Sequence, residues 1–487
     1  MSMARAKARR LGGALLVAAS GIGVLPSPVA SQSAGRAWTV YVANTQSNSV
    51  TPINAATNTA GAPIPTGAEP IAVAITPDSG AAFAPTGGDD MVTPIALATN
   101  TPGTPISAGD GPSAIAITPN GATAYITNEL SNNVTPIDVA THTAGTPFPT
   151  LESPTGIAIT PDGTTAYVVG PSGVVPIALA TNTAGALIPA GTEPNGLAVT
   201  PNGTTVYVAD VGGAQVFPID VATNTAGTPI HVGAAPLEIA ITPDGGTAYV
   251  VNADSDDVTP IDIATNTPGP SIPVGDTPFD IAITPDGATA YVVNQISNNV
   301  TPINLATRTA GTPIPSDDPQ GIAITPDQAP VARFLVTPAA AGSATTFDAS
   351  ASTVAFGTIA SYAWNFGDGT TATTTTPVTT HTYQTAGTYT VSVTETSSAG
   401  TSTTRVFTGQ TVSRNGGPQA IADGTVVIPA ATGGTTTTTS AGGGGTTTPV
   451  TLPATGGGAA NGTLVTMALV LLALGVALIA RNRRHPA

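Results

Sequence analysis

Short apolar runs, separated by turns rich in Pro, Gly and Asn, recur along the chain between residues 37 and 327. The sequence Thr-Pro followed by Asp or Asn marks each repeat, with its proline at Pro77, Pro119, Pro161, Pro201, Pro243, Pro285 and Pro326. Each full period holds four runs, as at residues 280–284, 289–293, 299–303 and 312–315. Their β-branched and aromatic content predicts four short strands per repeat.

The number and length of the repeats predict an all-β fold, a seven-bladed β-propeller over residues 37–327. A period of about 40–45 residues with four strands is typical of one propeller blade. One such sheet cannot bury its apolar faces, whereas a closed ring of sheets can. The chain enters the repeat at the second run, residues 38–42, and leaves it at the first run, residues 321–325. We therefore expect the two ends of the domain to complete one blade together.

Two segments carry a family resemblance: Tyr125-Ile-Thr-Asn128 and Tyr291-Val-Val-Asn294 resemble the signature of YVTN-family β-propellers. The resemblance implies a fold but no activity, because propellers include binding proteins, structural proteins and enzymes. The third run carries a proline in every copy, at Pro52, Pro94, Pro136, Pro176, Pro218, Pro260 and Pro302. Proline cannot donate to a ladder, so either the strand bulges there or the proline nitrogen faces a gap in the pairing.

A second domain is expected over residues 329–414, where the repeat stops. The segments 362–370 and 387–393 resemble a PKD domain, an immunoglobulin-like β-sandwich. Trp364 and Phe366 alternate with polar residues, so they are expected to point into the core.

The turn after this strand is expected at Gly367-Asp368-Gly369, where glycines suit positive backbone angles. Asp348 and Asp368 could together ligate calcium, but capping of the turn is the favoured role.

Both ends of the chain indicate export. Residues 1–34 read as a signal peptide, in which a basic segment precedes an apolar stretch too short to span a bilayer. The general secretory route is favoured over the twin-arginine route, because apolar residues are missing directly after Arg9-Arg10. Residues 415–450 are mainly Gly, Thr and Ala and are predicted to be a disordered linker.

The C-terminal region, residues 452–487, resembles a cell-wall sorting signal. Leu452-Pro453-Ala454-Thr455-Gly456 resembles the LPxTG motif of Gram-positive surface proteins, and an uncharged segment at 463–480 is followed by a basic tail. This order predicts a transmembrane helix with its basic end inside. The resemblance implies that a sortase cleaves after Thr455 and joins the protein to peptidoglycan. The alternative is a plain membrane anchor, and either would place the folded part outside the cell.

Charge is sparse and segregated. The chain has no cysteine, so disulfides and thiol chemistry are excluded. It has 28 acidic and 12 basic residues, for a net charge of −16. The basic residues between the two ends are Arg36, Arg308, Arg333, Arg405 and Arg414. Such a negative region repels nucleic acid and anionic lipid and attracts cations or basic partners. The alternative is that the acids only keep the surface soluble.

Many acids fall in two sets of loops that are expected to share one end of the propeller. They are Glu69, Asp89, Asp90, Asp110, Glu129, Glu152, Glu193, Asp210, Asp254, Asp256, Asp257, Asp276, Asp317 and Asp318. The densest group, Asp254, Asp256 and Asp257, could bind Ca²⁺. The alternative is a solvated acidic loop.

Motifs of catalysis are missing from the sequence. The exported region has isolated histidines at positions 142, 231 and 381, and neither a Gly-x-Ser-x-Gly elbow nor a phosphate-binding loop. The chain is therefore predicted not to be an enzyme, but a binding or structural module that meets an extracellular protein or cationic ligand. The alternative is an extracellular lyase, lactonase or redox-type propeller that uses its acidic, metal-binding end.

Overall fold

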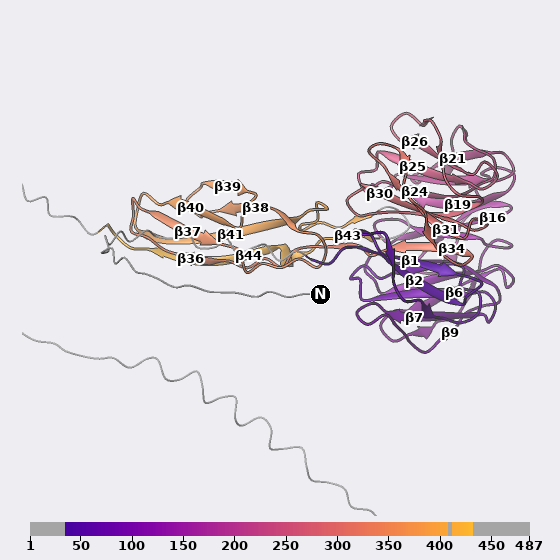
Figure 1. The fold of residues 1–487 in the computed structure, drawn as a ribbon, viewed down its shortest axis with the longest axis horizontal. Coiled ribbons are helices and arrows are strands. Elements are labelled where there is room, and N and C mark those ends of the chain that lie inside the picture. Colours follow the sequence, from indigo (N-terminus) through magenta and orange to yellow (C-terminus); the bar gives the residue numbers. More distant parts are fainter. Residues whose placement is uncertain (1–34, 408–411, 432–487) are drawn as a thin grey trace, which may run out of the picture. The chain divides into compact units, whose positions relative to one another are not determined.

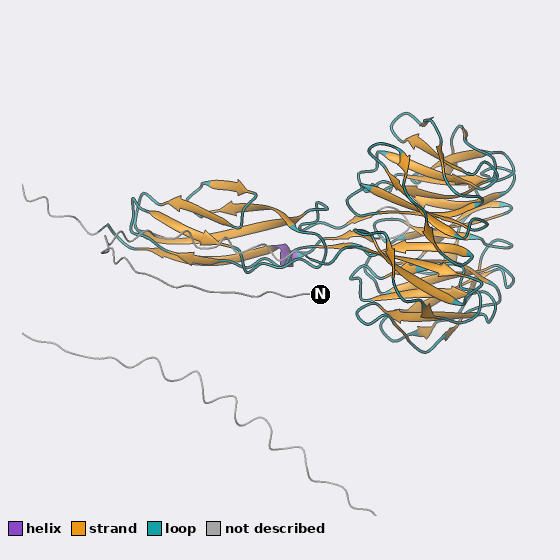
Figure 2. Cartoon of the chain, viewed as in Figure 1, coloured by secondary structure: helices purple, strands orange, loops and turns teal. Residues whose placement is uncertain are grey.

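The computed structural model describes residues 35–407 and 412–431. This part of the chain is built from β-strands and one short 3₁₀ helix, Pro418–Ala420 (Figure 2). The predicted signal peptide, the sorting motif at 452–456 and the transmembrane helix at 463–480 lie outside these residues. Within them, no helix has the length and apolar character needed to cross a membrane.

Seven antiparallel sheets follow one another between residues 39 and 324, each with the same strand order. The innermost strands are β5 (Ala74–Ile75), β10 (Pro112–Ile117), β15 (Gly156–Ile159), β19 (Pro194–Val199), β24 (Pro236–Ile241), β29 (Pro278–Ile283) and β34 (Pro319–Ile324). The second strands are β1 (Thr39–Asn44), β6 (Ala81–Thr86), β11 (Thr123–Asn128), β16 (Thr165–Gly170), β20 (Thr205–Asp210), β25 (Thr247–Asn252) and β30 (Thr289–Asn294).

The outer half of each sheet is less regular. The third strands are β2 (Ser49–Asn54), β7 (Met91–Ala96), β12 (Asn133–Asp138), β17 (Gly173–Ala178), β21 (Gln215–Asp220), β26 (Asp257–Asp262) and β31 (Asn299–Asn304). The fourth strand is broken into short pieces: β3 (Thr59–Ala60) and β4 (Ile64–Pro65), β8 (Thr101–Pro102) and β9 (Ile106–Ser107), β13 (Thr143–Ala144) and β14 (Phe148–Pro149), β18 (Thr183–Ala184), β22 (Thr225–Ala226) and β23 (Ile230–His231), β27 (Thr267–Pro268) and β28 (Ile272–Pro273), and β32 (Thr309–Ala310) and β33 (Ile314–Pro315).

The sheets close into a ring. Each innermost strand contacts the next, and β34 contacts β5 and lies beside β1 (Figure 1). β1 pairs antiparallel with β34, with Ala43 opposite Gly321. The prediction that the two ends of the domain complete one blade is confirmed. This closure removes the exposed sheet edge that an open array would leave.

Burial between neighbouring blades explains why the second strands are almost wholly apolar. In β25, Ala248 and Val250 pack into one core cluster, while Tyr249 and Val251 pack into the next. Since side chains alternate between the two faces of a strand, each blade buries both faces against its neighbours.

A tyrosine in the second strand also ties most blades to a neighbouring blade. The Tyr207 hydroxyl donates to Asn266 Oδ1 at 2.6 Å, and the same pairing joins Tyr41 to Asn100, Tyr125 to Asn182, Tyr167 to Asn224 and Tyr291 to Asn58. These hydrogen bonds fix the blades around the ring and so fix the shape of the channel.

The repeated prolines are explained by the broken fourth strand. Pro52 lies opposite Tyr41 in an unshifted register, so the strand does not bulge there. Its carbonyl accepts from Gly61 N at 2.7 Å, between the two pieces β3 and β4. Because the N and O of one strand residue point to the same side, the proline nitrogen faces the break. The second alternative, a gap in the pairing, is therefore correct.

The second domain is a two-sheet sandwich. One sheet contains β36 (Leu335–Thr337), β37 (Ala344–Asp348) and β40 (Val378–Thr382), and the other contains β39 (Thr371–Thr374), β38 (Ile359–Asn365), β41 (Gly387–Ser397) and β44 (Ile421–Ile428). β35 (Asp327–Gln328), β42 (Val406–Phe407) and β43 (Val412–Asn415) form a small third sheet.

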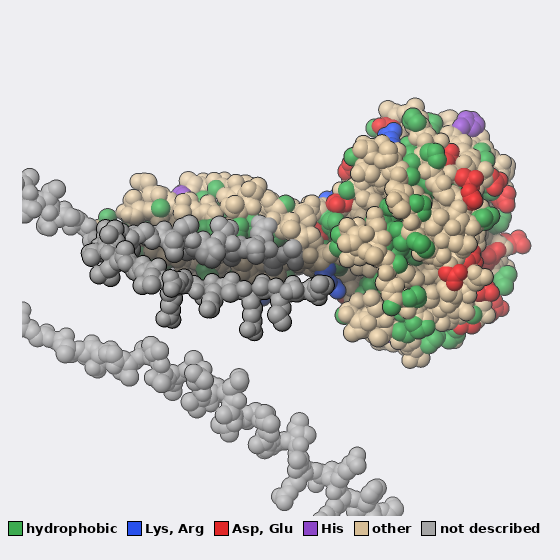
Figure 3. Space-filling view, in the orientation of Figure 1, with side chains coloured by type: hydrophobic (Ala, Val, Ile, Leu, Met, Phe, Trp, Pro, Cys, Tyr) green, Lys and Arg blue, Asp and Glu red, His purple; other side chains and the backbone are tan. Residues whose placement is uncertain are grey.

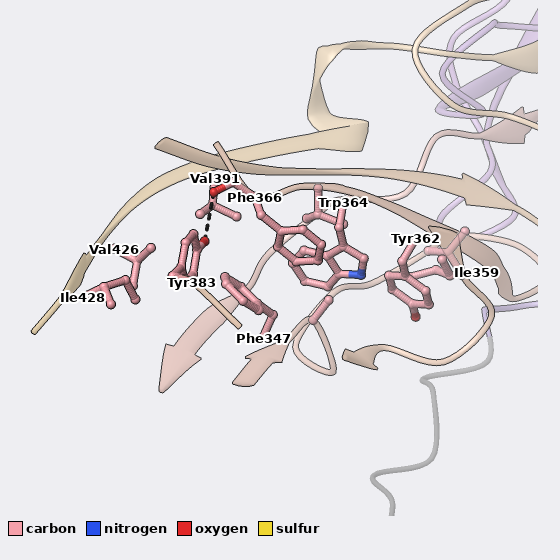
Figure 4. Packing of buried hydrophobic residues seen from close by; sticks show 12 residues of the cluster. Phe347, Ile359, Tyr362, Trp364, Phe366, Tyr383, Val391, Val426 and Ile428 are labelled. Carbon is pink, nitrogen blue, oxygen red and sulfur yellow. Dashed lines mark hydrogen bonds between the residues drawn. The ribbon is translucent and has the colours of Figure 1, made fainter. Parts of the chain in front are cut away.

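The sandwich core is aromatic, as its sequence predicted. Trp364 and Phe366 are buried, with the Phe347 ring 5.7 Å and 5.1 Å from them (Figure 4). Gly367 and Gly369 have φ of 79° and 90° in the turn that follows. The inward position of Trp364 and Phe366 and the glycine turn are both confirmed.

The sandwich extends beyond residue 414, where the disordered linker was expected to begin. β44 pairs with β41 along its whole length, and Val426 and Ile428 enter the core. The alternation of these two apolar residues is short and lies in a segment dominated by Gly, Thr and Ala, so composition concealed it.

Candidate functional site

The central channel contains a cavity of about 550 Å³. It is lined by the innermost strands and by loops at the end where these strands begin. The polar side chains that contribute carboxylate or amide groups to it are Glu69, Glu129, Asn195, Glu238, Asp280 and Gln320. Of the described residues that line the cavity, none is Lys or Arg.

The second residue after the proline at or just before the start of each innermost strand distinguishes two blades from the other five. Five copies have Ala72, Ala114, Gly156, Gly196 and Gly321 at this position. The strands approach closely there: a Cβ atom on residue 321 would lie 2.5 Å from Ala72 Cα. Two consecutive blades instead carry Glu238 and Asp280. These carboxylates therefore break a small-residue pattern that the packing of the ring favours.

Asp280 is half-buried in the cavity wall and held by two backbone groups. Its Oδ1 accepts from Ile281 N at 2.7 Å, and its Oδ2 accepts from Ile322 N, on the next blade, at 3.0 Å. Burial raises the pKa of Asp280 to about 7, despite these two hydrogen bonds, which lower it. Both protonation states are then populated near neutral pH, which suits a general base or acid.

Glu238 lies on the neighbouring strand β24, and its carboxylate occupies space left by a glycine. A Cβ atom on residue 196 would lie 2.4 Å from Glu238 Oε2. Glu238 Oε1 accepts from Ile239 N at 3.2 Å. The absence of a side chain at Gly196 thus makes room for this second carboxylate.

Two amides flank the carboxylates. Asn195 on β19 and Gln320 on β34 line the same cavity, so four consecutive innermost strands carry Asn195, Glu238, Asp280 and Gln320. Each side-chain amide carries two N–H donors. Both amides can therefore donate to a ligand. The backbone carbonyl of Asn195 already accepts a hydrogen bond from the Thr155 hydroxyl at 2.8 Å.

The acidic loops share one end of the propeller, as predicted. Figure 3 shows Asp and Glu side chains gathered on the right-hand side of the propeller in that view. The two sets of loops are joined by hydrogen bonds, such as Gly111 N to Asp90 Oδ1 at 2.8 Å and Thr277 N to Asp256 Oδ1 at 2.9 Å. Glu69 and Glu129 place this end at the mouth of the cavity.

The densest acidic loop has structural hydrogen bonds. Asp256 Oδ1 accepts from Thr277 N, and Asp257 Oδ1 accepts from Asn252 Nδ2 at 2.7 Å. In residues 35–407 and 412–431, no group of three or more His, Cys, Asp or Glu could hold a metal ion. A calcium site at Asp254, Asp256 and Asp257 stays a prediction. In the sandwich, Asp368 Oδ1 accepts from Thr370 N at 3.0 Å, which fits turn capping.

Sequence reasoning missed Glu238 and Asp280, although the signal was present. Aligning the seven copies of the first strand shows one column that holds an acid in two copies and Ala or Gly in the other five. The predicted acidic sites lie in loops, and the residues considered for catalysis were histidines. Acidic residues inside the strands belong to neither group and were not predicted. The sorting motif Leu452–Gly456 lies outside the described residues.

Comparison with protein families decides the type of propeller. Residues 35–271 match the family model described as lactonase, 7-bladed beta-propeller, and residues 327–412 match the PKD domain. The chain contains a lactonase-type seven-bladed propeller and a PKD domain. The finer resemblance to the YVTN family stays a prediction.

Solved structures share the fold of the lactonase-type propeller. A hydrazine synthase of Kuenenia stuttgartiensis is 21% identical, with a TM-score of 0.52, over 59% of this chain and 99% of its own. A putative 6-phosphogluconolactonase of Bacteroides fragilis is 17% identical, with a TM-score of 0.50, over 61% and 99%. No match was found among curated protein sequences.

The prediction that the chain is not an enzyme is wrong. The match of residues 35–271 to the lactonase family model points to an enzyme-type propeller. The physical reason is that isolated histidines do not exclude catalysis. A carboxylate in a cavity can transfer protons without histidine.

Proposed function

We propose that the lactonase-type propeller is a hydrolase that opens an uncharged cyclic ester in its central channel. The observation that carries the proposal is Asp280, a carboxylate with a pKa raised to about 7 in the wall of a cavity of about 550 Å³. The match of residues 35–271 to the lactonase family model supports the same reaction class.

The chemistry requires one water and returns its protons to the product. The Asp280 carboxylate takes a proton from water as the water oxygen attacks the ester carbonyl. An amide N–H of Asn195 or Gln320 donates to the oxyanion that forms. The protonated Asp280 then gives the proton to the ring oxygen as the ring C–O bond breaks, and a hydroxy acid results.

The charges around the cavity select the substrate and favour release of the product. A phosphorylated lactone, such as the name of the Bacteroides fragilis protein implies, would meet Glu69, Glu129, Glu238 and Asp280 without a counter-charge. An uncharged lactone avoids this repulsion. The product is a carboxylate at neutral pH, so the acidic rim favours its departure.

The location of the enzyme is proposed from sequence alone. The signal peptide and the motif at Leu452–Gly456 support a protein outside a Gram-positive cell, joined to peptidoglycan by a sortase. Thr455→Ala should then move the protein from the wall fraction to the membrane fraction, as measured by fractionation and blotting.

Hydrolysis of a panel of lactones tests the proposed function directly. The full chain is assayed by pH-stat with γ-butyrolactone, δ-valerolactone, glucono-δ-lactone and 6-phosphoglucono-δ-lactone. We expect turnover of the uncharged lactones and a loss of about 10²–10⁴-fold in kcat in Asp280→Asn. Asp254→Asn, at an exposed acid outside the cavity lining, is the matched control and should keep full activity. Absence of turnover refutes the reaction class, and preference for the phosphorylated lactone refutes the charge argument.

A further inference from the structure

One rim residue of the cavity is an exposed leucine. Leu130 lies in the loop between β11 and β12, lines the cavity, and is 74% exposed. Equivalent loop positions in the other blades hold Gln46, Gly88, Gly212, Asp254 and Ile296, and the loop after β16 is shorter. A large aliphatic side chain at this place is therefore the exception, and an exposed one gains free energy when a ligand covers it.

The position of Leu130 is fixed by the backbone beneath it. Leu130 N donates to the Asp110 carbonyl at 3.1 Å. A Cβ atom on Gly111 would lie 2.7 Å from Leu130 Cγ, so the leucine side chain rests over this glycine at the start of β10. Ile296, the other aliphatic residue of the set, is 66% exposed but is not among the residues lining the cavity.

The cavity wall below Leu130 is aliphatic. The two innermost strands on this side, β5 and β10, and the residues just before β5 contribute Ile71, Ala72, Ala114 and Ile115. Ser113 adds a hydroxyl, but that hydroxyl donates to the Pro154 carbonyl at 2.6 Å. The carboxylates and amides carried by the strands lie on β19, β24, β29 and β34, whereas Glu69 and Glu129 lie in loops at the mouth. The wall of the cavity thus has a polar arc of four strands and an aliphatic arc below Leu130.

We infer that the substrate is an uncharged lactone with an apolar substituent, which packs along the aliphatic arc and against Leu130 while the ester faces Asp280. This inference rests on the proposed function and names the substrate class of the same site. The aliphatic side chains of this wall offer no hydrogen bonds to a polar substituent, which would lose its hydration there without compensation. Each methylene taken from water should strengthen binding about three- to fourfold.

A series of γ-lactones tests the inference. The full chain is assayed with γ-butyrolactone, γ-valerolactone, γ-hexalactone and γ-octalactone, whose alkyl substituent lengthens from none to butyl. We expect kcat/KM to rise about threefold per methylene. Leu130→Asn should flatten this slope, because the rim no longer covers the alkyl chain. Ile296→Asn is the matched control, at the equivalent loop position outside the cavity lining, and should keep both slope and rate.

The outcomes separate this inference from the proposed function. If wild-type protein hydrolyses no lactone, the proposed function fails and the inference falls with it. If γ-butyrolactone is hydrolysed but the slope is flat or negative, only the substrate class is overturned. Equal flattening by Leu130→Asn and Ile296→Asn would also overturn it, since the effect would then not depend on the cavity.

Discussion

Asp280 in the propeller and Glu395 in the sandwich are two carboxyl groups with the same perturbation and different surroundings. Burial raises the pKa of each to about 7. Asp280 faces a cavity of about 550 Å³, whereas the Glu395 side chain is fully buried on β41. A raised pKa can mark a functional site, but here only one of the two groups can meet a substrate. Access, and not the shift, distinguishes a candidate base from a structural acid.

The surroundings of Glu395 explain its raised pKa. Its Oε1 accepts from the Ser352 hydroxyl at 2.6 Å. In the described part of the chain, its Oε2 is buried with no hydrogen-bond partner. Ionisation would leave a charge in the sandwich core with one hydrogen bond, which is costly. For Asp280, two backbone N–H groups lower the pKa against the burial that raises it, and the carboxylate faces the cavity.

The largest expected effect is on the stability of the sandwich. The pKa of Glu395 is raised from 4.5 to about 7 on folding, so the folded state keeps a proton that the unfolded state releases. Stability contributed by this proton is present below pH 4.5, falls as pH rises to about 7, and is then lost. The loss amounts to about 3 kcal/mol. Glu395→Gln removes the titration. The free energy of unfolding of the variant, relative to that of wild type, should therefore rise by this amount between pH 4.5 and 8.

Urea unfolding of the full chain at pH 4.5 and pH 8 measures this gain, with fluorescence of Trp364 in a Trp38→Phe background as the reporter of the sandwich. Glu69→Gln, at an exposed acid of the propeller, is the control and should show no pH-dependent gain. If the free energy of unfolding depends on pH in the same way in wild type and in Glu395→Gln, the pKa of Glu395 is not raised. The two carboxyl groups would then not share the same perturbation.

The second effect is on the rate of the proposed hydrolysis. Because Asp280 must be ionised to accept a proton, kcat/KM should rise roughly a hundredfold between pH 5 and 8, with a midpoint near its raised pKa of about 7. Initial rates on γ-butyrolactone across this range measure it. Glu395→Gln should leave the midpoint unchanged, because that acid has no access to the cavity. A flat profile would remove Asp280 as the base.

The sequence predicted the scaffold better than the site, for a physical reason. The repeat can be recognised in the sequence because every blade must bury the same apolar faces, as residues 248–251 show in β25. Ring closure and the shared acidic end followed from the same regularity, whereas the aromatic sandwich core followed from the alternation of Trp364 and Phe366 with polar residues. Asp280 and Glu238 were missed because a site on a repeat protein is a departure from the repeat. Their burial, and the pKa of Asp280, depend on neighbouring blades that no local pattern describes.

The smallest effects are expected for substitutions of the exposed acids in the loops, which are compared with the two buried carboxyl groups. Asp256 has φ of 55° and holds Thr277 N through Oδ1. Equivalent positions hold Asn48, Asn132 and Asn298, also at positive φ. Asp256→Asn keeps the acceptor and a residue tolerant of this conformation, so stability should change by less than about 0.5 kcal/mol. Asp256→Ala loses the hydrogen bond and should cost about 1 kcal/mol.

Thermal unfolding with and without millimolar calcium measures both variants and also tests the predicted calcium site. If Asp256 only holds the loop, calcium should shift neither wild type nor Asp256→Asn, and lactone hydrolysis should be unchanged in both. A calcium-dependent rise in Tm that Asp256→Asn abolishes would instead establish a cation site at Asp254, Asp256 and Asp257. In that case an exposed acidic loop would have a ligand of its own, and access together with a raised pKa would no longer separate functional from structural carboxylates in this protein.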